Sequence, residues 1–156
     1  MRRRAVLSLI AACLLAACAH QTAPEAMAGM DWSFTDAAAG GGEAKLAFGA
    51  PNSDNVVVML ACQAKSGRIA VSTVESRPAA EMTLTSRGRT SRHVAQALPN
   101  ELGDGTLVEA QAPAADPTLA SFAESGELAV AVGGRRLALP NADRAEARKF
   151  VDGCRA

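Results

Sequence analysis

Apolar and polar residues alternate with a period of two through most of the chain after residue 30, which predicts a β-rich fold. Trp32 and Phe34 stand two residues apart, as do Leu46 and Phe48. Glycine, proline and other turn residues separate the alternating segments. We interpret as strands residues 30–35, a segment around 46–48, and residues 56–63, 68–75, 81–86, 89–98, 106–111, 128–132 and 137–139.

Residues 56–63 (VVVMLACQ) differ from the other segments because they are apolar on both faces. A strand with this pattern is expected at the centre of a sheet and covered on both sides. Lys65, Ser66 and Gly67 supply a turn before the next alternating segment, so the two segments are expected to form a central hairpin.

Two helices are predicted in the second half of the chain. Asp116 followed by Pro117 is a typical helix start, and Gly126 is a typical stop. Asn141 is expected to cap a second helix, whose apolar residues follow at helical spacing up to Cys154. The fold class that we predict is an antiparallel β-sandwich or flattened barrel of eight or nine strands, with one short helix and a C-terminal helix.

The first residues have the pattern of a secretory signal peptide: three arginines at 2–4, then an apolar run at 5–15. Eleven helical residues cover only about half of a ~30 Å hydrocarbon core. Residues 18–29 contain a proline and a glycine without any period and are expected to be a flexible tether. The predicted organisation is therefore a signal peptide (1–17), a tether (18–29) and one β-rich domain (30–156).

The end of this signal, Leu15-Ala16-Ala17-Cys18, resembles the lipobox of bacterial lipoproteins. The resemblance implies a diacylglycerol thioether on the Cys18 sulfur and cleavage before that residue. It also implies that the membrane is a partner through this lipid. Because Ala19 stands where some of these families use aspartate for inner-membrane retention, the expected location is the outer membrane, facing the periplasm.

Two cysteines remain for the folded domain, because Cys13 would leave with the signal and Cys18 would carry lipid. A pair such as Cys62 and Cys154 in an exported chain most often forms a disulfide. It would close a loop of about 90 residues and contribute about 4–5 kcal/mol of stability. The alternative, a redox or metal site, lacks both the C-x-x-C spacing and further ligands.

Charge and motifs narrow the function. Three of the sixteen basic residues lie in the signal, so the remainder carries thirteen basic against sixteen acidic residues. This balance gives no footprint for nucleic acid. The glycines at 40–42 do not fit a phosphate-binding loop, and neither G-x-S-x-G nor H-E-x-x-H occurs. We therefore predict a protein that is not an enzyme and that has no cofactor and no metal.

One row of residues has candidate binding chemistry. Arg87, Arg89 and His93 are separated by even numbers of residues, with Ser91 between them, so an extended chain would point all four to one face. Such a row is suited to bind a phosphate, a carboxylate or an anionic envelope polymer. The alternative is a solvated outer face whose cations prevent edge pairing. A Ser–His–Asp set would also have to use His93.

The body of the chain is similar in layout to two groups of exported proteins. Cys62 in an early strand, the Ser125–Leu128 stretch and Cys154 after a short helix resemble uncharacterised alphaproteobacterial lipoproteins and, loosely, the invasion-associated locus B proteins. The stretch 86–93 resembles the inhibitory loop of membrane-bound inhibitors of c-type lysozyme, without their tyrosine. These resemblances imply a lipid-anchored envelope domain that binds a polymer or protein, or alternatively an inhibitor of a wall-degrading enzyme.

Overall fold

The computed structural model describes residues 27–101 and 103–156. The predicted signal peptide at 1–17 and the predicted lipid attachment at Cys18 lie outside the described residues. Within the described part, the chain forms nine strands and two helices. In chain order they are β1 (Asp31–Thr35), β2 (Glu43–Gly49), β3 (Val56–Gln63), β4 (Arg68–Glu75), β5 (Glu81–Ser86), β6 (Arg89–Pro99), β7 (Thr106–Pro113), α1 (Pro117–Ser125), β8 (Ala129–Val132), β9 (Arg135–Ala138) and α2 (Arg144–Cys154).

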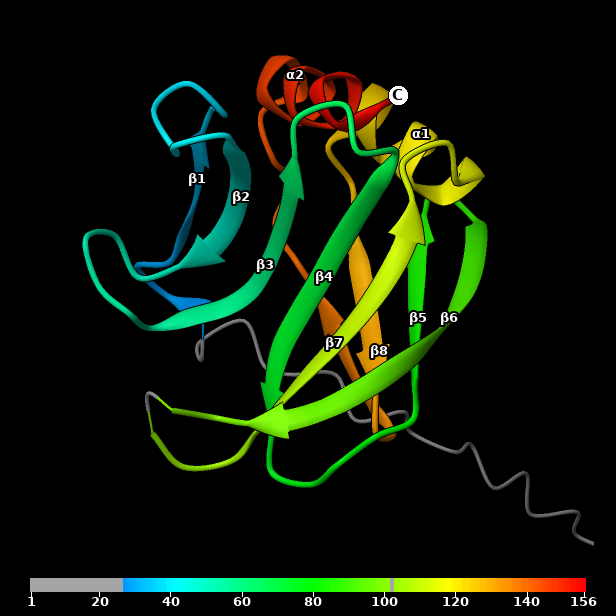
Figure 1. The fold of residues 1–156 in the computed structure, drawn as a ribbon. Helices are drawn as coiled ribbons and strands as arrows, with labels where there is room; N and C mark the ends of the chain where they lie inside the picture. Colours follow the sequence, from blue (N-terminus) through cyan, green and yellow to red (C-terminus); the bar gives the residue numbers. More distant parts are fainter. Residues whose placement is uncertain (1–26, 102) are drawn as a thin grey trace, which may run out of the picture.

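All nine strands belong to one antiparallel sheet with the order β1-β2-β3-β4-β7-β6-β5-β8-β9. The sheet curls into a half-barrel, and the two helices lie together across one end of it (Figure 1). The predicted class, an antiparallel β-sandwich or flattened barrel of eight or nine strands with a short helix and a C-terminal helix, is confirmed, with the nine strands in a half-barrel. The strand bounds predicted for β3, β4 and β5 agree with the structure residue by residue.

The two ends of the sheet differ. At the end that we call the loop end, β1 begins, since Asp31 pairs with Gly49, and the connections β2–β3, β4–β5, β6–β7 and β8–β9 are found. At the opposite end, which we call the helix end, α1 and α2 pack against each other (top of Figure 1). The backbone N–H of Gly67 in the β3–β4 turn donates to the carbonyl of Cys154, 2.8 Å away.

The core fills the concave side of the half-barrel beneath the helices. Its largest side chains include Phe48, Phe122 and Phe150, and none of these is accessible to solvent. Cys62 on β3 and Cys154 on α2 form a disulfide. The pairing predicted from the sequence therefore agrees with the structure, and the bond joins the last helix to the sheet.

The edge strands β1 and β9 are not joined by backbone hydrogen bonds between them. A side chain, that of Trp32, connects the two edges instead. The indole N–H of Trp32 on β1 donates to the carbonyl of Pro140, just after β9, at 2.7 Å. The ring of Trp32 also contacts Phe48 and Phe122, with centroids 5.5 and 6.0 Å apart. A half-buried aromatic ring with a satisfied N–H is well suited to this position.

Two predicted boundaries are different in the structure. The cap of α2 is Asp143, not Asn141, because the carboxylate of Asp143 accepts from the N–H groups of Ala145 and Glu146 at 2.8 and 3.1 Å. The segment before the helix binds the end of α1, since Ala142 N–H donates to the carbonyl of Gly126 at 2.9 Å. Packing also starts earlier than residue 30, because Met27 already contacts the core.

Candidate binding groove

The pairing between β3 and β4 is unusually short for two strands of eight residues. Only Met59 with Ser72, Leu60 with Val71 and Ala61 with Ala70 are in register. Toward the loop end the two strands diverge, as Figure 1 shows. There the hydroxyl of Thr73 donates to the carbonyl of Val57 at 2.8 Å, so a side chain spans the gap that the ladder leaves.

A groove of about 800 Å³ lies where the strands diverge, on the convex side of the sheet, and we call it the β3–β4 groove. Its volume is within the range of about 300–1,000 Å³ that is typical of small-molecule sites. Residues of the β2–β3 and β6–β7 connections flank it. Its lining consists of Ser53, Asp54, Asn55, Val56, Met59, Ser72, Thr73, Val74, Leu98, Pro99, Asn100, Glu101 and Leu107.

The exposed surface within the groove is mainly apolar. Met59, Val74 and Leu107 project from the outer face of the sheet, and Leu98 of β6 lies beside Leu107 in register. Val74 and Leu98 are 37% and 39% exposed, which is unusual for large apolar side chains in this molecule. Neighbouring exposed apolar side chains of this kind are typical of a binding surface.

Local hydrogen bonds order the two loops that flank the groove. In the β2–β3 connection, the hydroxyl of Ser53 donates to the carbonyl of Ala50 at 3.0 Å and accepts from Asn55 N–H at 3.1 Å. In the β6–β7 connection, the amide of Asn100 donates to the carbonyl of Asp104 at 3.0 Å. Serine and asparagine stabilise turns in this way, so each flanking loop contains a turn that is stabilised by the loop's own residues.

An ion pair between Arg135 and Glu75 stabilises β4 where β3 and β4 diverge. Arg135 of β9 donates from Nε to the carboxylate of Glu75 at 3.1 Å, and its terminal nitrogen also contacts that carboxylate. The same nitrogen donates to the carbonyl of Val74 at 3.1 Å. Glu75 is only 8% exposed. Since a buried carboxylate requires a partner, Arg135 satisfies both the carboxylate and a backbone carbonyl of the strand that forms one wall of the groove.

The predicted row of Arg87, Arg89 and His93 is formed only in part. Arg89, Ser91 and His93 share one face of β6, as predicted, but it is the inner face and not an outer one. Arg87 lies in the β5–β6 turn with φ +45°, and Arg89 is exposed at the first position of β6. His93 points inward, because its register partner Met82 is fully buried and paired residues share a face. The concave face holds the core, so the alternation of β6 carries His93 beneath α1 and the arginines remain at the turn.

His93 contacts both Ser91 and Asp116, yet the arrangement differs from a catalytic triad. Its Nε2 lies 3.0 Å from Ser91 Oγ and 3.5 Å from Asp116 Oδ2, so one ring nitrogen makes both contacts. A Ser–His–Asp triad uses the two ring nitrogens separately, one for the serine and one for the carboxylate. Oδ1 of Asp116 caps α1 by accepting from Thr118 N–H at 2.7 Å. The cluster therefore holds the start of α1 against β6.

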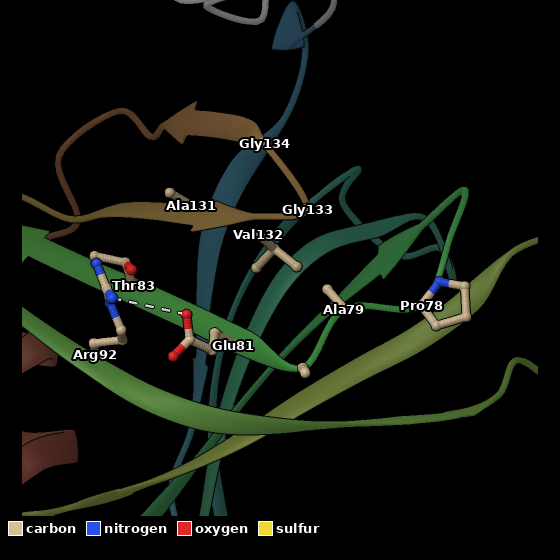
Figure 2. A pocket seen from close by; sticks show the side chains of 10 residues that line it. Pro78, Ala79, Glu81, Thr83, Arg92, Ala131, Val132, Gly133 and Gly134 are labelled. Carbon is tan, nitrogen blue, oxygen red and sulfur yellow. Dashed lines mark ion pairs between the residues drawn. The ribbon is translucent and has the colours of Figure 1, made fainter.

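A second hollow of about 540 Å³ lies near the β8–β9 turn at the loop end (Figure 2). Arg92 and Glu81 face each other on its surface, with an N–O distance of 3.8 Å. It is more open than the β3–β4 groove and less apolar. Because its arginine already faces a carboxylate, this hollow would attract an anion more weakly than a site with an unpaired cation. The β3–β4 groove is therefore the stronger candidate site.

Across residues 27–101 and 103–156, no three or more His, Cys, Asp or Glu side chains are grouped so that they could hold a metal ion. None of the helices in the same ranges is long and apolar enough to cross a membrane. Comparison of the chain with protein-family models, with curated proteins and with solved structures finds no match.

The groove residues were not among the candidates from the sequence, although a signal for them was present. The apolar residues on both faces of 56–63 predict a strand that is covered on both sides. In the structure the inner residues Val58 and Leu60 are buried, whereas Val56 and Met59 are only partly covered and line the groove. The second apolar face of β3 thus belongs to the groove.

Proposed function

We propose that the protein is a non-catalytic domain of a bacterial cell envelope, anchored by lipid on Cys18, that binds an acyl chain of a membrane lipid in the β3–β4 groove. The observation that supports this most directly is the position of the groove. Its flanking loops lie at the loop end of the sheet, which is also where β1 begins. The predicted anchor and the apolar groove would therefore be at the same end of the domain.

Chain length limits how far the loop end would be from the membrane. Met27, which packs against the core, follows Cys18 by nine positions along the chain. At 3.3–3.6 Å per residue they span at most roughly 30 Å. A lipid on Cys18 would therefore keep the groove within reach of the bilayer surface, where acyl chains are the most abundant apolar ligand.

The lining of the groove favours an acyl chain over the anionic polymer that the sequence suggested. An anionic sugar requires cations, whereas the charged residues of this lining are the carboxylates of Asp54 and Glu101. A methylene chain would instead cover Met59, Val74 and Leu98. The gain comes from the groove itself, because covering these exposed side chains removes their apolar surface from water at about 25 cal/mol per Å².

Two measurements on the full chain test this proposal. The first is the intact mass of the protein purified from a bacterium that processes lipoproteins, compared with the Cys18→Ser variant. We expect the mass of a chain that starts at Cys18 and carries lipid, and loss of both features in the variant. A wild-type chain with an unmodified Cys18 would contradict the anchoring.

The second measurement is photolabelling in vesicles that contain a phospholipid with a diazirine in its acyl chain. We expect labelled peptides from β3, β4, β6 and β7. Leu98→Glu places a charge in the groove and should reduce labelling by about tenfold or more. Val94→Glu is the matched control, because Val94 lies on the same face of β6, is 81% exposed and does not line the groove. Equal labelling of both variants would contradict the proposal.

A further inference from the structure

The rim of the β3–β4 groove carries two carboxylates and no cation among its lining residues. Asp54 comes from the β2–β3 connection and Glu101 from the β6–β7 connection, so the two acidic side chains are supplied by both flanking loops. Both residues are exposed, and neither is part of an ion pair within the described residues.

Two further carboxylates at the loop end already face an arginine, whereas Asp54 and Glu101 do not. Glu75 is paired with Arg135, and Glu81 faces Arg92. Because paired charges largely cancel, the negative potential at this end is concentrated where carboxylates are unpaired. An apolar wall beside a carboxylate also strengthens its interaction with a nearby cation, since less water screens the pair.

The charge of the rim restricts which lipid head fits when a chain lies in the groove. A lipid head follows its acyl chain to the mouth of the groove, close to the two flanking loops. An anionic phosphoglycerol head or a free fatty-acid carboxylate would meet like charge there, whereas an ammonium group would meet opposite charge. The apolar lining and the acidic rim together therefore select an amphiphile with a positive end.

We infer that the ligand of the β3–β4 groove is a membrane phospholipid with an amine-bearing, zwitterionic head, its acyl chain on Met59, Val74 and Leu98 and its ammonium between Asp54 and Glu101. This inference rests on the proposed function, because it assumes that an acyl chain occupies the groove. It adds the chemical class of the head, which the groove lining alone does not fix.

The test uses the full lipidated chain in vesicles of an uncharged lipid background with a trace of one photoactivatable phospholipid. The same diazirine-bearing chain is attached to phosphatidylethanolamine in one preparation and to phosphatidylglycerol in the other. One favourable charge contact near a surface predicts about fivefold more groove labelling by the ethanolamine lipid at low salt. Raising the ionic strength should reduce the preference, because the rim is exposed.

Substitution of the rim provides the control for charge. The double variant Asp54→Asn, Glu101→Gln should label with both lipids to a similar extent. Asp104→Asn is the matched control, because it removes a carboxylate from the same connection as Glu101 without changing the groove lining. We expect it to retain the wild-type preference. All three residues are exposed, so these variants should fold.

The outcomes separate this inference from the proposed function. Groove labelling that is equal for both heads, or a preference that survives in the double variant, overturns the headgroup assignment and leaves acyl-chain binding intact. A preference for phosphatidylglycerol overturns it as well. Labelling that avoids the groove peptides with either lipid overturns acyl-chain binding itself.

Discussion

The helix end and the loop end of this molecule are built from the same strands but differ in how completely those strands are covered. At the helix end, Phe122, Phe150 and Cys154 are fully buried and a disulfide joins helix to sheet. At the loop end, β3 and β4 diverge, and Val74 and Leu98 remain more than a third exposed. The helix end therefore has the packing that stabilises the fold. The loop end has the apolar surface that is available for a ligand.

Strand β3 runs between the two ends and contributes to stability at one end and to the groove at the other. Cys62, near its end, is bonded to α2, whereas Val56 and Met59 line the groove. Because the disulfide fixes β3 at the helix end, β3 can diverge from β4 at the loop end without loss of the fold. The separation implies that changes at the helix end should affect stability, and that changes at the loop end should affect binding.

The largest effect is expected from removal of the disulfide by Cys62→Ala with Cys154→Ala. The bond spans a sequence separation of 92 residues. Chain-entropy arguments assign about 4–5 kcal/mol to a loop of that size. Urea unfolding of the oxidised wild type and of the double variant measures the difference. Hydrogen exchange should show that α2 loses more protection than β6 and β7, and a loss of stability under about 1 kcal/mol would contradict the prediction.

The same substitution at both ends should have unequal costs. Leu119 of α1 is fully buried, whereas Leu98 is 39% exposed. Leu119→Ala should therefore cost about 2–5 kcal/mol, and Leu98→Ala less than about 1 kcal/mol. Denaturant unfolding of the two variants gives both values. Similar costs would show that the loop end contributes to the core as much as the helix end does.

The strand architecture could be predicted from the sequence because it depends on local patterns. Alternation gave the bounds of β4 and β5, and it also predicted strands at 128–132 and 137–139, which the structure pairs as β8 and β9. The start and end of α1 followed from Asp116 and Gly126, whose φ is +73°. A side chain at Gly126 would also clash with the carbonyl of Ala142, so this glycine is required by a long-range contact that the local pattern does not reveal.

The candidate site could not be predicted because it depends on which strands separate. A strand that is apolar on both faces looks the same whether its second face is buried or lines a groove. The inward position of His93 likewise depends on β6 passing beneath α1, which no local pattern encodes. The N-cap of α2 is Asp143 and not the predicted Asn141, because Ala142 between them forms a hydrogen bond with Gly126 at the end of α1.

A smaller effect is expected from Arg135→Met, which leaves the buried carboxylate of Glu75 without its partner. Breaking a fully buried pair costs about 3–5 kcal/mol, and because the side chain of Arg135 is 38% exposed we expect about 2 kcal/mol. Replacing both residues, as Arg135→Met with Glu75→Leu, should recover most of the loss. Unfolding free energies measure all three chains. A single variant as stable as the wild type would show that β4 does not need this support beside the groove.

The smallest effect concerns Asp36, in the β1–β2 connection at the helix end. The backbone N–H of Ala39 and then the ammonium of Lys149 on α2 lower the pKa of Asp36 below its ordinary value of 3.8, with contacts of 2.9 and 3.4 Å. A lowered pKa in the folded state means that the carboxylate contributes stability above its unfolded pKa, and that this contribution disappears as the pH falls through the folded pKa.

Lys149→Met separates the two causes of this shift. Without the ammonium, the pKa of Asp36 should rise toward its ordinary value but remain below it, because the N–H of Ala39 still donates to the carboxylate. Titration of the side-chain carboxyl carbon by NMR measures both chains. Since Asp36 is exposed, the accompanying change in stability should be small and should decrease with salt. An unchanged pKa in the variant would mean that the helix end is held by packing and the disulfide, with no contribution from the Asp36–Lys149 pair.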